Sequence, residues 1–196
     1  MIRIIAKAPK KKTPDSTRKS SKKTLKNNKL IKNAGVKKAA TRKTALKKAV
    51  PKVAVRNSPI HGRGVFAVTA IAKGARILEY TGERMSHAKA DRLYGDLHDG
   101  SSHTMLFAAT DKVVIDATKR GGPARWINHS CAPNCEANEE DGRVFIDAIR
   151  AIGAGQELSY DYNLVLEERH TAKQKRDHPC HCGARKCRHT LLGNKR

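Results

Sequence analysis

The chain has 196 residues, with 41 Lys and Arg against 18 Asp and Glu, and five Cys. This length fits one domain of ordinary size with extra segments. It contains no apolar run long enough to span a bilayer, and the opening MIRIIA is too short for the apolar core of a signal peptide, so we expect an intracellular protein without a membrane anchor. An odd number of clustered Cys, partly beside His, favours metal binding or free thiols over a disulfide framework.

The positive charge is concentrated at the N-terminus. Residues 1–55 hold 19 Lys and Arg, one acidic residue and no aromatic residue, whereas the remaining chain has a net charge of only +5. Such a segment cannot bury enough apolar area to offset its ordering entropy, so residues 1–52 are predicted to be a disordered basic tail. The tail is suited to binding DNA through phosphate neutralisation, and a solubilising tail without a partner is the alternative.

From residue 53 on, short apolar runs alternate with turn residues. We expect strands at 64–68, 75–80, 104–109, 112–117, 143–149 and 156–162, with hairpin turns at DKV and EDGRV. One helix is expected at 86–97 with Ser86 as its N-cap, and another from Leu164 to about Lys175. Many strands without a regular βα alternation predict a mostly β fold of small sheets with few short helices.

The string CHCGARKC contains three cysteines, Cys180, Cys182 and Cys187, within eight residues. Three thiolates at this spacing can bind one Zn²⁺, which needs a fourth ligand, and four thiolates would make the site closed and structural. Unliganded, reduced thiols are the alternative. The spacing leaves four candidates for the fourth ligand: Cys131, Cys135, His181 and His189.

Two further patterns are weak on their own. The turn Gly62-Arg63-Gly64 could hold a ligand with backbone N–H groups, but it lacks the third glycine of a dinucleotide site, and a plain turn is the alternative. Three tyrosines lie in EYTGE and ELSYDYN. Tyr160 and Tyr162 would share one face of a strand, while ordinary packing tyrosines are the alternative interpretation.

The motifs gain meaning from their order along the chain. GRGVF, YTGE, IDAT, RWINHSCAPNC, ELSYDY and C-x-C-x4-C follow one another between about residues 53 and 189. In this order the chain resembles SET-domain protein-lysine methyltransferases with a post-SET zinc segment. The resemblance implies a β-clip-like fold with a pseudoknot, in which the NHSC and ELSYDY segments cross. It divides the chain into a tail (1–52), a SET domain (53–164) and a C-terminal helix with the post-SET segment (165–196).

The same resemblance assigns roles to individual residues. It implies that S-adenosylmethionine is bound by His61, Arg63, Gly64, Val65, Asn128, His129 and Tyr162. It implies that Tyr162 is the catalytic tyrosine, that Tyr160 sets the number of methyl groups added, and that Tyr80 lines the lysine channel. Cys131 rather than Cys135 matches the fourth ligand of a structural zinc, which leaves Cys135 as a spare thiol. Met105 departs from the family pattern, where a tyrosine is common, and so does Pro123.

The expected function is therefore S-adenosylmethionine-dependent methylation of a lysine in a protein, with the chain acting as a monomer. The substrate expected is a basic DNA-associated protein, histone or histone-like, or the chain's own tail. We expect the protein at the nucleoid of a bacterium, which the compact architecture favours, or at the chromosomes of a eukaryotic nucleus. A non-catalytic SET-like zinc module and a zinc-containing nucleic-acid-binding protein of another fold are the competing hypotheses.

Overall fold

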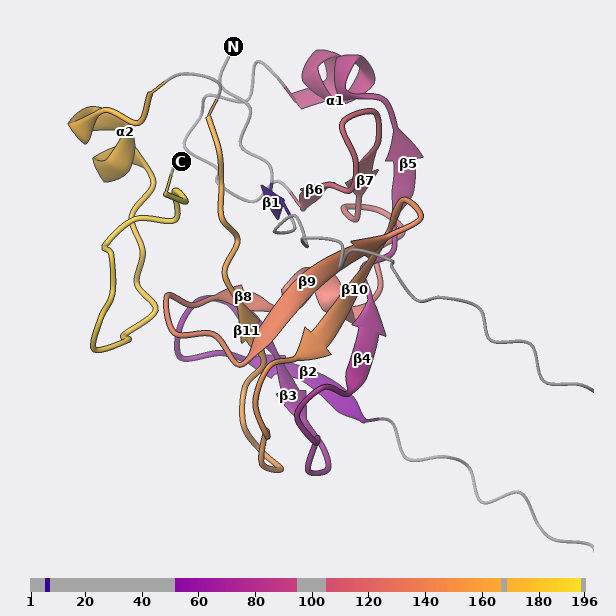
Figure 1. Ribbon diagram of the computed structural model, residues 1–196, viewed down its shortest axis with the longest axis vertical. Helices are drawn as coiled ribbons and strands as arrows, with labels where there is room; N and C mark the ends of the chain where they lie inside the picture. The colour runs from indigo at the N-terminus through magenta and orange to yellow at the C-terminus, as the bar shows by residue number, and fades with distance from the viewer. Residues whose placement is uncertain (1–5, 8–51, 95–104, 167–168, 195–196) are drawn as a thin grey trace, which may run out of the picture. The chain divides into compact units, whose positions relative to one another are not determined.

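The computed structural model describes residues 6–7, 52–94, 105–166 and 169–194 (Figure 1). Met1–Lys10 and Pro51–Arg196 belong to one compact unit, and a second unit, Lys11–Val50, lies outside the described residues. The predicted basic tail therefore falls mostly outside the described part of the chain. Its described residues Ala6 and Lys7 form a short strand.

The described residues are mostly β-structure with only two short α-helices, which confirms the predicted fold class. The elements in chain order are β1 (Ala6–Lys7), β2 (Val53–Asn57), β3 (Arg63–Ala67), β4 (Arg76–Glu79), β5 (Glu83–Met85), α1 (His87–Tyr94), β6 (Leu106–Ala108), β7 (Val114–Asp116), the 3-10 helix η1 (Pro123–Trp126), β8 (Asn128–His129), β9 (Cys135–Glu140), β10 (Arg143–Ala148), β11 (Ser159–Tyr160) and α2 (Ala172–Asp177).

Four small sheets are formed within the described residues, with strand orders β1-β6-β7-β5, β4-β10-β9, β11-β8 and β2-β3. Each of the six predicted strands corresponds to an observed one, but the last was predicted too long, since only Ser159 and Tyr160 of 156–162 form a strand. The prediction missed β1, which lies in the segment predicted to be disordered, and also β2, β5, β8 and β9. Very short strands carry little periodicity, because side-chain alternation needs several residues to be seen.

Both predicted hairpin turns are confirmed. The β6–β7 hairpin is closed by the N–H of Ala109, which donates to the carbonyl of Val113 at 2.9 Å. In the β9–β10 hairpin Asp141 and Gly142 have φ values of 51° and 74°. Positive φ at both central residues gives the tight turn whose twist matches the flanking strands, which explains the Asp-Gly pair.

The first helix is confirmed and the second prediction is partly wrong. Ser86 caps α1, because its hydroxyl accepts from the N–H of Lys89 at 3.2 Å; residues 95–97 of the predicted helix lie outside the described residues. The second helix begins at Ala172, after the N-cap Thr171, and not at Leu164. Leu164 instead forms a β-bridge with Leu192, and both side chains are buried in the core. The apolar residue Leu164 therefore packs in the core and does not belong to a helix.

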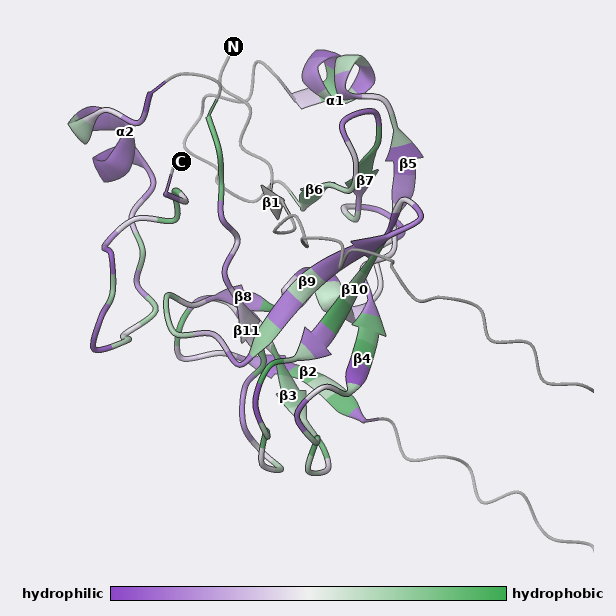
Figure 2. Ribbon diagram, viewed as in Figure 1, coloured by the Kyte–Doolittle hydropathy of each residue, from purple (hydrophilic) through white to green (hydrophobic). Residues whose placement is uncertain are grey.

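The core includes residues of several small sheets, and β4 and β10, which carry hydrophobic residues (Figure 2), contribute to it. Next to the core, β8 and β11 pair in parallel, with Asn128 opposite Ser159 and His129 opposite Tyr160. This pairing brings the NHSC and ELSYDY strings together, although the β9–β10 hairpin separates them in the sequence. Within the described residues, no helix has the length and apolar character needed to cross a membrane.

Candidate functional site

Aromatic side chains form a continuous cluster beside the β8–β11 pair, in which Tyr162 is half-buried and the others are buried. Ring centroids lie 5.2 Å apart for Tyr80 and Phe107, 6.3 Å for Phe107 and Tyr160, and 5.0 Å for Tyr160 and Tyr162. Tyr80 follows β4, Phe107 lies in β6, and Tyr160 lies in β11. The structure therefore brings together the three tyrosines singled out in the sequence, and adds Phe107 between two of them.

Two of these hydroxyl groups donate to backbone carbonyls. The Tyr162 hydroxyl donates to the carbonyl of Ile127 at 2.8 Å, and the Tyr80 hydroxyl donates to the carbonyl of Met105 at 3.0 Å. Burial raises the pKa of Tyr80, Tyr160 and Tyr162 above the ordinary tyrosine value. The phenols are therefore neutral at physiological pH. They can donate hydrogen bonds and offer oxygen lone pairs, but they are not phenolate bases.

Asn128 connects β8 to the turn that precedes β3. Its side-chain amide donates to the carbonyl of Arg63 at 2.9 Å, to the carbonyl of His61 at 3.3 Å and to a carboxylate oxygen of Glu157 at 2.8 Å. Asn128 is itself buried, so this amide is a fixed link and not a solvent-facing group. The predicted ligand-binding residues at 61–64 are thereby joined to the NHSC strand.

Glu157 is a site residue that the sequence analysis missed. Its carboxylate accepts from the Ser58 hydroxyl at 2.8 and 2.9 Å as well as from Asn128. A Cβ at Gly64 would collide with this carboxylate, so a side chain there would force Glu157 to move. In the sequence, Glu157 is only an acidic residue next to the apolar Leu158. That pattern is common and does not indicate a site residue.

His129 lies at the centre of the site and its tautomer follows from its contacts. The N–H of Tyr162 donates to Nδ1 at 3.1 Å, so the neutral ring carries its proton on Nε2. Nε2 lies 3.4 Å from Sγ of Cys131. Burial lowers the pKa of His129 to about 4, so the imidazole is uncharged at neutral pH. One ring therefore contacts both the tyrosine segment and the cysteine cluster.

Asp161 lies between these two parts of the site. Its carboxylate is 3.5 Å from Nδ1 of His129 and accepts two hydrogen bonds from the Arg188 guanidinium, at 2.5 and 2.6 Å. Burial raises the pKa of Asp161, but the hydrogen bonds from Arg188 lower it by more than burial raises it. The net pKa is therefore below the usual value. This bidentate pair ties the C-terminal segment to the residue between Tyr160 and Tyr162.

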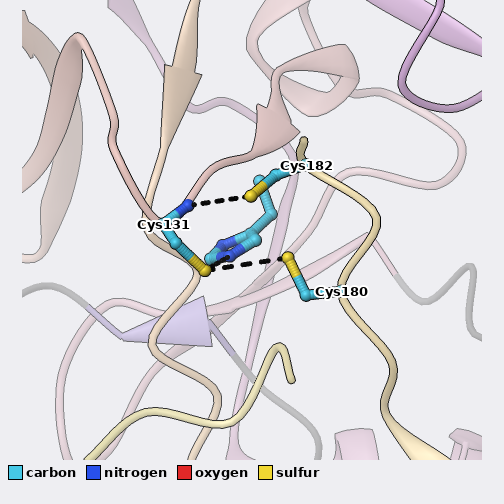
Figure 3. Close-up of side chains that lie close together, drawn as sticks. Cys131, Cys180 and Cys182 are labelled. Carbon is cyan, nitrogen blue, oxygen red and sulfur yellow. Dashed lines mark hydrogen bonds between the residues drawn. The ribbon is translucent and has the colours of Figure 1, made fainter. Parts of the chain in front are cut away.

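Four cysteine thiols form a compact cluster, part of which is drawn in Figure 3. Sγ of Cys131 lies 3.7 Å from Sγ of Cys180 and 3.9 Å from Sγ of Cys187, and the Cys182 and Cys187 sulfurs are 3.7 Å apart. Zn–S bonds of about 2.3 Å in a tetrahedron place sulfurs about 3.8 Å apart. The donor set and its spacing therefore fit one zinc ion.

The thiols of the cluster differ in their pKa. Burial raises the pKa of Cys131 and Cys180. Burial raises the pKa of Cys182, but hydrogen bonds from the N–H groups of Cys131 and Ala184 outweigh it, and the net pKa is about 6. Zinc binds the thiolate form, which the lowered pKa of Cys182 favours. His129, Cys131, Cys180 and Cys182 also have ligand atoms within 4.8 Å of one another. The second nitrogen of His129 is engaged by Tyr162, so His129 can support the cluster through Nε2–H while Cys187 supplies the fourth sulfur.

The remaining residues predicted to bind zinc or the cofactor differ in burial. Cys135 is fully buried in β9, where burial raises the pKa of its thiol to about 12 and its Sγ–H donates to the Asn134 side chain. The His181 and His189 side chains are exposed. His61 and Arg63 are also exposed, and the Arg63 guanidinium stacks 5.1 Å from the Trp126 ring, while Val65 is buried in β3.

The chain matches the family model described as the SET domain over residues 62–163. It is 44% identical over 138 residues to the H3 lysine-4-specific histone-lysine N-methyltransferase of Aspergillus fumigatus, and 41% identical over 136 residues to that of Saccharomyces cerevisiae. Each match covers 67% of this chain, but only 11% and 12% of the relative's length.

Solved structures give a consistent result. The polycomb repressive complex 2 of Chaetomium thermophilum matches with a TM-score of 0.53 and 28% identity, over 61% of this chain and 17% of that chain. The same complex in an autoinhibited conformation bound to S-adenosylmethionine matches with a TM-score of 0.51 and 31% identity, over 58% of this chain and 15% of that one. With the family model covering residues 62–163, the chain belongs to the SET-domain family.

Proposed function

We propose that this chain is an S-adenosylmethionine-dependent protein-lysine N-methyltransferase. The observation that carries the proposal is the parallel β8–β11 pair, which places Tyr160 and Tyr162 beside Asn128 and His129. Relatives that are 41% and 44% identical to this chain are named histone-lysine N-methyltransferases, which supports the same reaction.

The cofactor would be held by the residues around Asn128. His61, Arg63, Gly64 and Val65 lie in or beside β3, and the Asn128 amide fixes the first two through their carbonyls. Gly64 leaves room because it has no side chain next to Glu157. When bound, S-adenosylmethionine supplies an electrophilic methyl group on a positively charged sulfur. Asn128 and His129 would orient the cofactor from β8.

The aromatic cluster would prepare the lysine for attack. A free lysine with a pKa of about 10.4 is neutral only to about one part in a thousand at pH 7. A buried, tyrosine-lined surface disfavours the ammonium and so lowers the lysine pKa. Because the Tyr80 and Tyr162 hydroxyls stay protonated and are fixed by carbonyls, they position the amine without removing its proton. The proton leaves to water before the attack, and alignment of the amine supplies much of the rate.

Tyr160 would set the number of methyl groups. It is buried between Phe107 and Tyr162, so its hydroxyl takes up space in which a larger, already methylated amine would have to fit. We therefore propose mono- or dimethylation. The zinc, bound by Cys131, Cys180, Cys182 and Cys187, would be structural, because four thiolates leave no open coordination position.

The proposed substrate is a basic DNA-associated protein of the histone or histone-like class, or the chain's own lysine-rich N-terminus. The names of the relatives support a chromosomal location, where the basic tail would hold the protein by contacts with DNA phosphates. We propose that the monomer is active, because the site residues described above all come from one chain.

The test is methyl transfer by the full chain to a panel of histones and bacterial DNA-binding proteins, read by mass spectrometry with Tyr162→Phe as the matched control. We expect transfer to lysine by the wild-type chain and at least a tenfold loss in the variant, which keeps the ring and loses only the hydroxyl. Cofactor binding measured by calorimetry separates the alternatives. No cofactor binding, together with no transfer to any protein, the chain itself included, would favour the non-catalytic module.

A further inference from the structure

Beyond residue 55, the positive charge of the chain is concentrated in its last segment. Residues 56–168 carry 13 Lys and Arg against 16 Asp and Glu, a net charge of −3. Residues 169–196 carry nine Lys and Arg against one acidic residue, Asp177, a net charge of +8. The segment that contains α2 and the cysteine loop is therefore strongly basic in its own right, separately from the N-terminal tail.

Most of the cations in this segment have no acidic partner. Of the seven basic residues in the described range 169–194, Lys173 pairs with Asp177 and Arg188 pairs with Asp161. The other five side chains are exposed and form no ion pair within the described part of the chain. These five residues are called the C-terminal basic surface below: Arg169, Lys175, Arg176, Arg185 and Lys186.

Helix α2 presents its side chains to solvent. None of the residues Ala172–Asp177 is buried, and a capping box holds the first turn. A helix of this length is marginal by itself, so its other end needs an anchor. His178 provides it, because its Nδ1 donates to the carbonyl of Gln174 at 2.7 Å and its own carbonyl accepts from the N–H of Leu191 at 2.9 Å. The helix is thereby fastened to the chain that follows the cysteine loop.

The cysteine loop presents the remaining two cations. Arg185 and Lys186 lie between Cys182 and Cys187, in a turn closed by the N–H of Cys187, which donates to the carbonyl of Ala184 at 2.9 Å. Both flanking sulfurs belong to the cysteine cluster, so the zinc that this cluster would bind fixes both ends of the turn. Figure 1 shows α2 and this loop along one edge of the molecule.

The chemistry of this surface fits double-stranded DNA. Lys and Arg neutralise backbone phosphates without reading the sequence, and a duplex carries one charge per about 1.7 Å of its axis. Residues 169–194 contain no Phe, Tyr or Trp, so this segment offers unpaired bases no aromatic ring to stack on. The sequence of α2, AKQKRD, also lacks the apolar face by which a basic helix enters a lipid surface. Duplex DNA is therefore favoured over a single strand and over a membrane.

We propose that the C-terminal basic surface binds duplex DNA through phosphate contacts, and that the cysteine cluster keeps its two parts in place. This role goes beyond methyl transfer and does not depend on it. A contact made by the folded part of the chain also fixes the orientation of the SET domain relative to the duplex.

The test compares two full-length variants with the wild type. The surface variant combines Arg169→Gln, Lys175→Gln, Arg176→Gln, Arg185→Gln and Lys186→Gln. The control variant lowers the net charge equally at five exposed cations elsewhere in the folded part, with Lys73→Gln, Arg92→Gln, Lys112→Gln, Lys119→Gln and Arg120→Gln. The dissociation constant for a DNA duplex is measured at several salt concentrations, with and without a zinc chelator. Zinc content and Tm verify that both variants are folded.

Each phosphate contact adds about 0.9 to the slope of log Kd against log salt concentration. We expect this slope to fall by about 3 to 4 in the surface variant, with at least a tenfold weaker affinity at physiological salt, and by less than about 1 in the control. The chelator should lower the wild-type slope by the same amount and leave the slope of the surface variant unchanged.

Three results would overturn the proposal. Equal losses in the two variants would mean that net charge alone acts. A wild-type slope that the chelator does not change would remove the cysteine cluster from the DNA contact. An equal loss of affinity for single-stranded DNA, or a larger loss for phosphatidylserine vesicles, would exclude the duplex as the preferred partner.

Discussion

The backbone N–H of Tyr162 donates to Nδ1 of His129 at 3.1 Å, and the opposite nitrogen of the same ring lies 3.4 Å from Sγ of Cys131. The imidazole ring of His129 therefore contacts both the cysteine cluster and the backbone of the proposed catalytic tyrosine. His129 is buried and uncharged, so it acts here as a rigid spacer and hydrogen-bonding group.

We expect His129→Ala to lower kcat/KM for methyl transfer at least tenfold, which corresponds to about 1.4 kcal/mol of transition-state stabilisation. With saturating cofactor the loss should be mainly in kcat, because the substitution releases the Tyr162 backbone. Steady-state kinetics on the purified variant measure it. The exposed His181 provides the matched control, and His181→Ala should keep wild-type kinetics. An equal loss in both variants would contradict a positioning role for His129.

Zinc removal should disorder the C-terminal part of the site. We expect the wild-type chain to contain one zinc per molecule by elemental analysis, and Cys180→Ser to lose most of it together with a lowered Tm, because metal binding is coupled to folding of such segments. Cys135→Ala is the control, since Cys135 lies in β9 and forms no part of the cluster. Loss of zinc in Cys135→Ala with retention in Cys180→Ser would reverse the assignment.

Glu157 is expected to position Asn128 for the cofactor. In Glu157→Gln an amide nitrogen replaces one acceptor oxygen, so a donor faces the Ser58 hydroxyl or the Asn128 amide. Losing one charge-assisted hydrogen bond costs about 1.5–3 kcal/mol, so we expect at least a fivefold weaker cofactor affinity by calorimetry. Glu83→Gln, which removes an exposed ion pair with Lys89, should leave the affinity unchanged. Equal affinities in the wild type and Glu157→Gln would exclude this role.

A side chain at position 64 would displace the Glu157 carboxylate. Gly64→Ala places a methyl group against the Glu157 carboxylate and Ser58, so we expect a loss of about 1–3 kcal/mol in the free energy of unfolding, measured by chemical denaturation. In Gly153→Ala the new methyl group would lie 3.6 Å from the Gln156 side chain, an ordinary contact, and stability should change by less than about 0.5 kcal/mol. Equal stabilities of the two variants would show that Glu157 moves freely.

Sequence reasoning succeeded where local chemistry decides the structure. The Asp141-Gly142 turn and the Ser86 cap could be predicted, because turn and cap residues act within a few positions. It failed for the helix expected from Leu164, since burial of Leu164 against Leu192 is a contact between remote segments.

In the candidate site, too, sequence motifs predicted individual residues but not the contacts between remote segments. The motifs identified its tyrosines and cysteines, but not the partners that fix them. Glu157 gave no pattern of its own, because its role arises only when Ser58 and Asn128 meet it in space. The two-residue strand β8 gave no strand signal, and β11 was predicted too long, since each is held by the core around it and not by its own periodicity.

The parallel pairing of Asn128 with Ser159 also has a kinetic consequence. The β9–β10 hairpin between them is a local structure that forms within microseconds, whereas the parallel pair must close the whole intervening loop before any contact stabilises it. Recovery from denaturant should therefore be stepwise. Secondary structure returns early, and the capacity to capture a ligand returns only when the two remote segments have met.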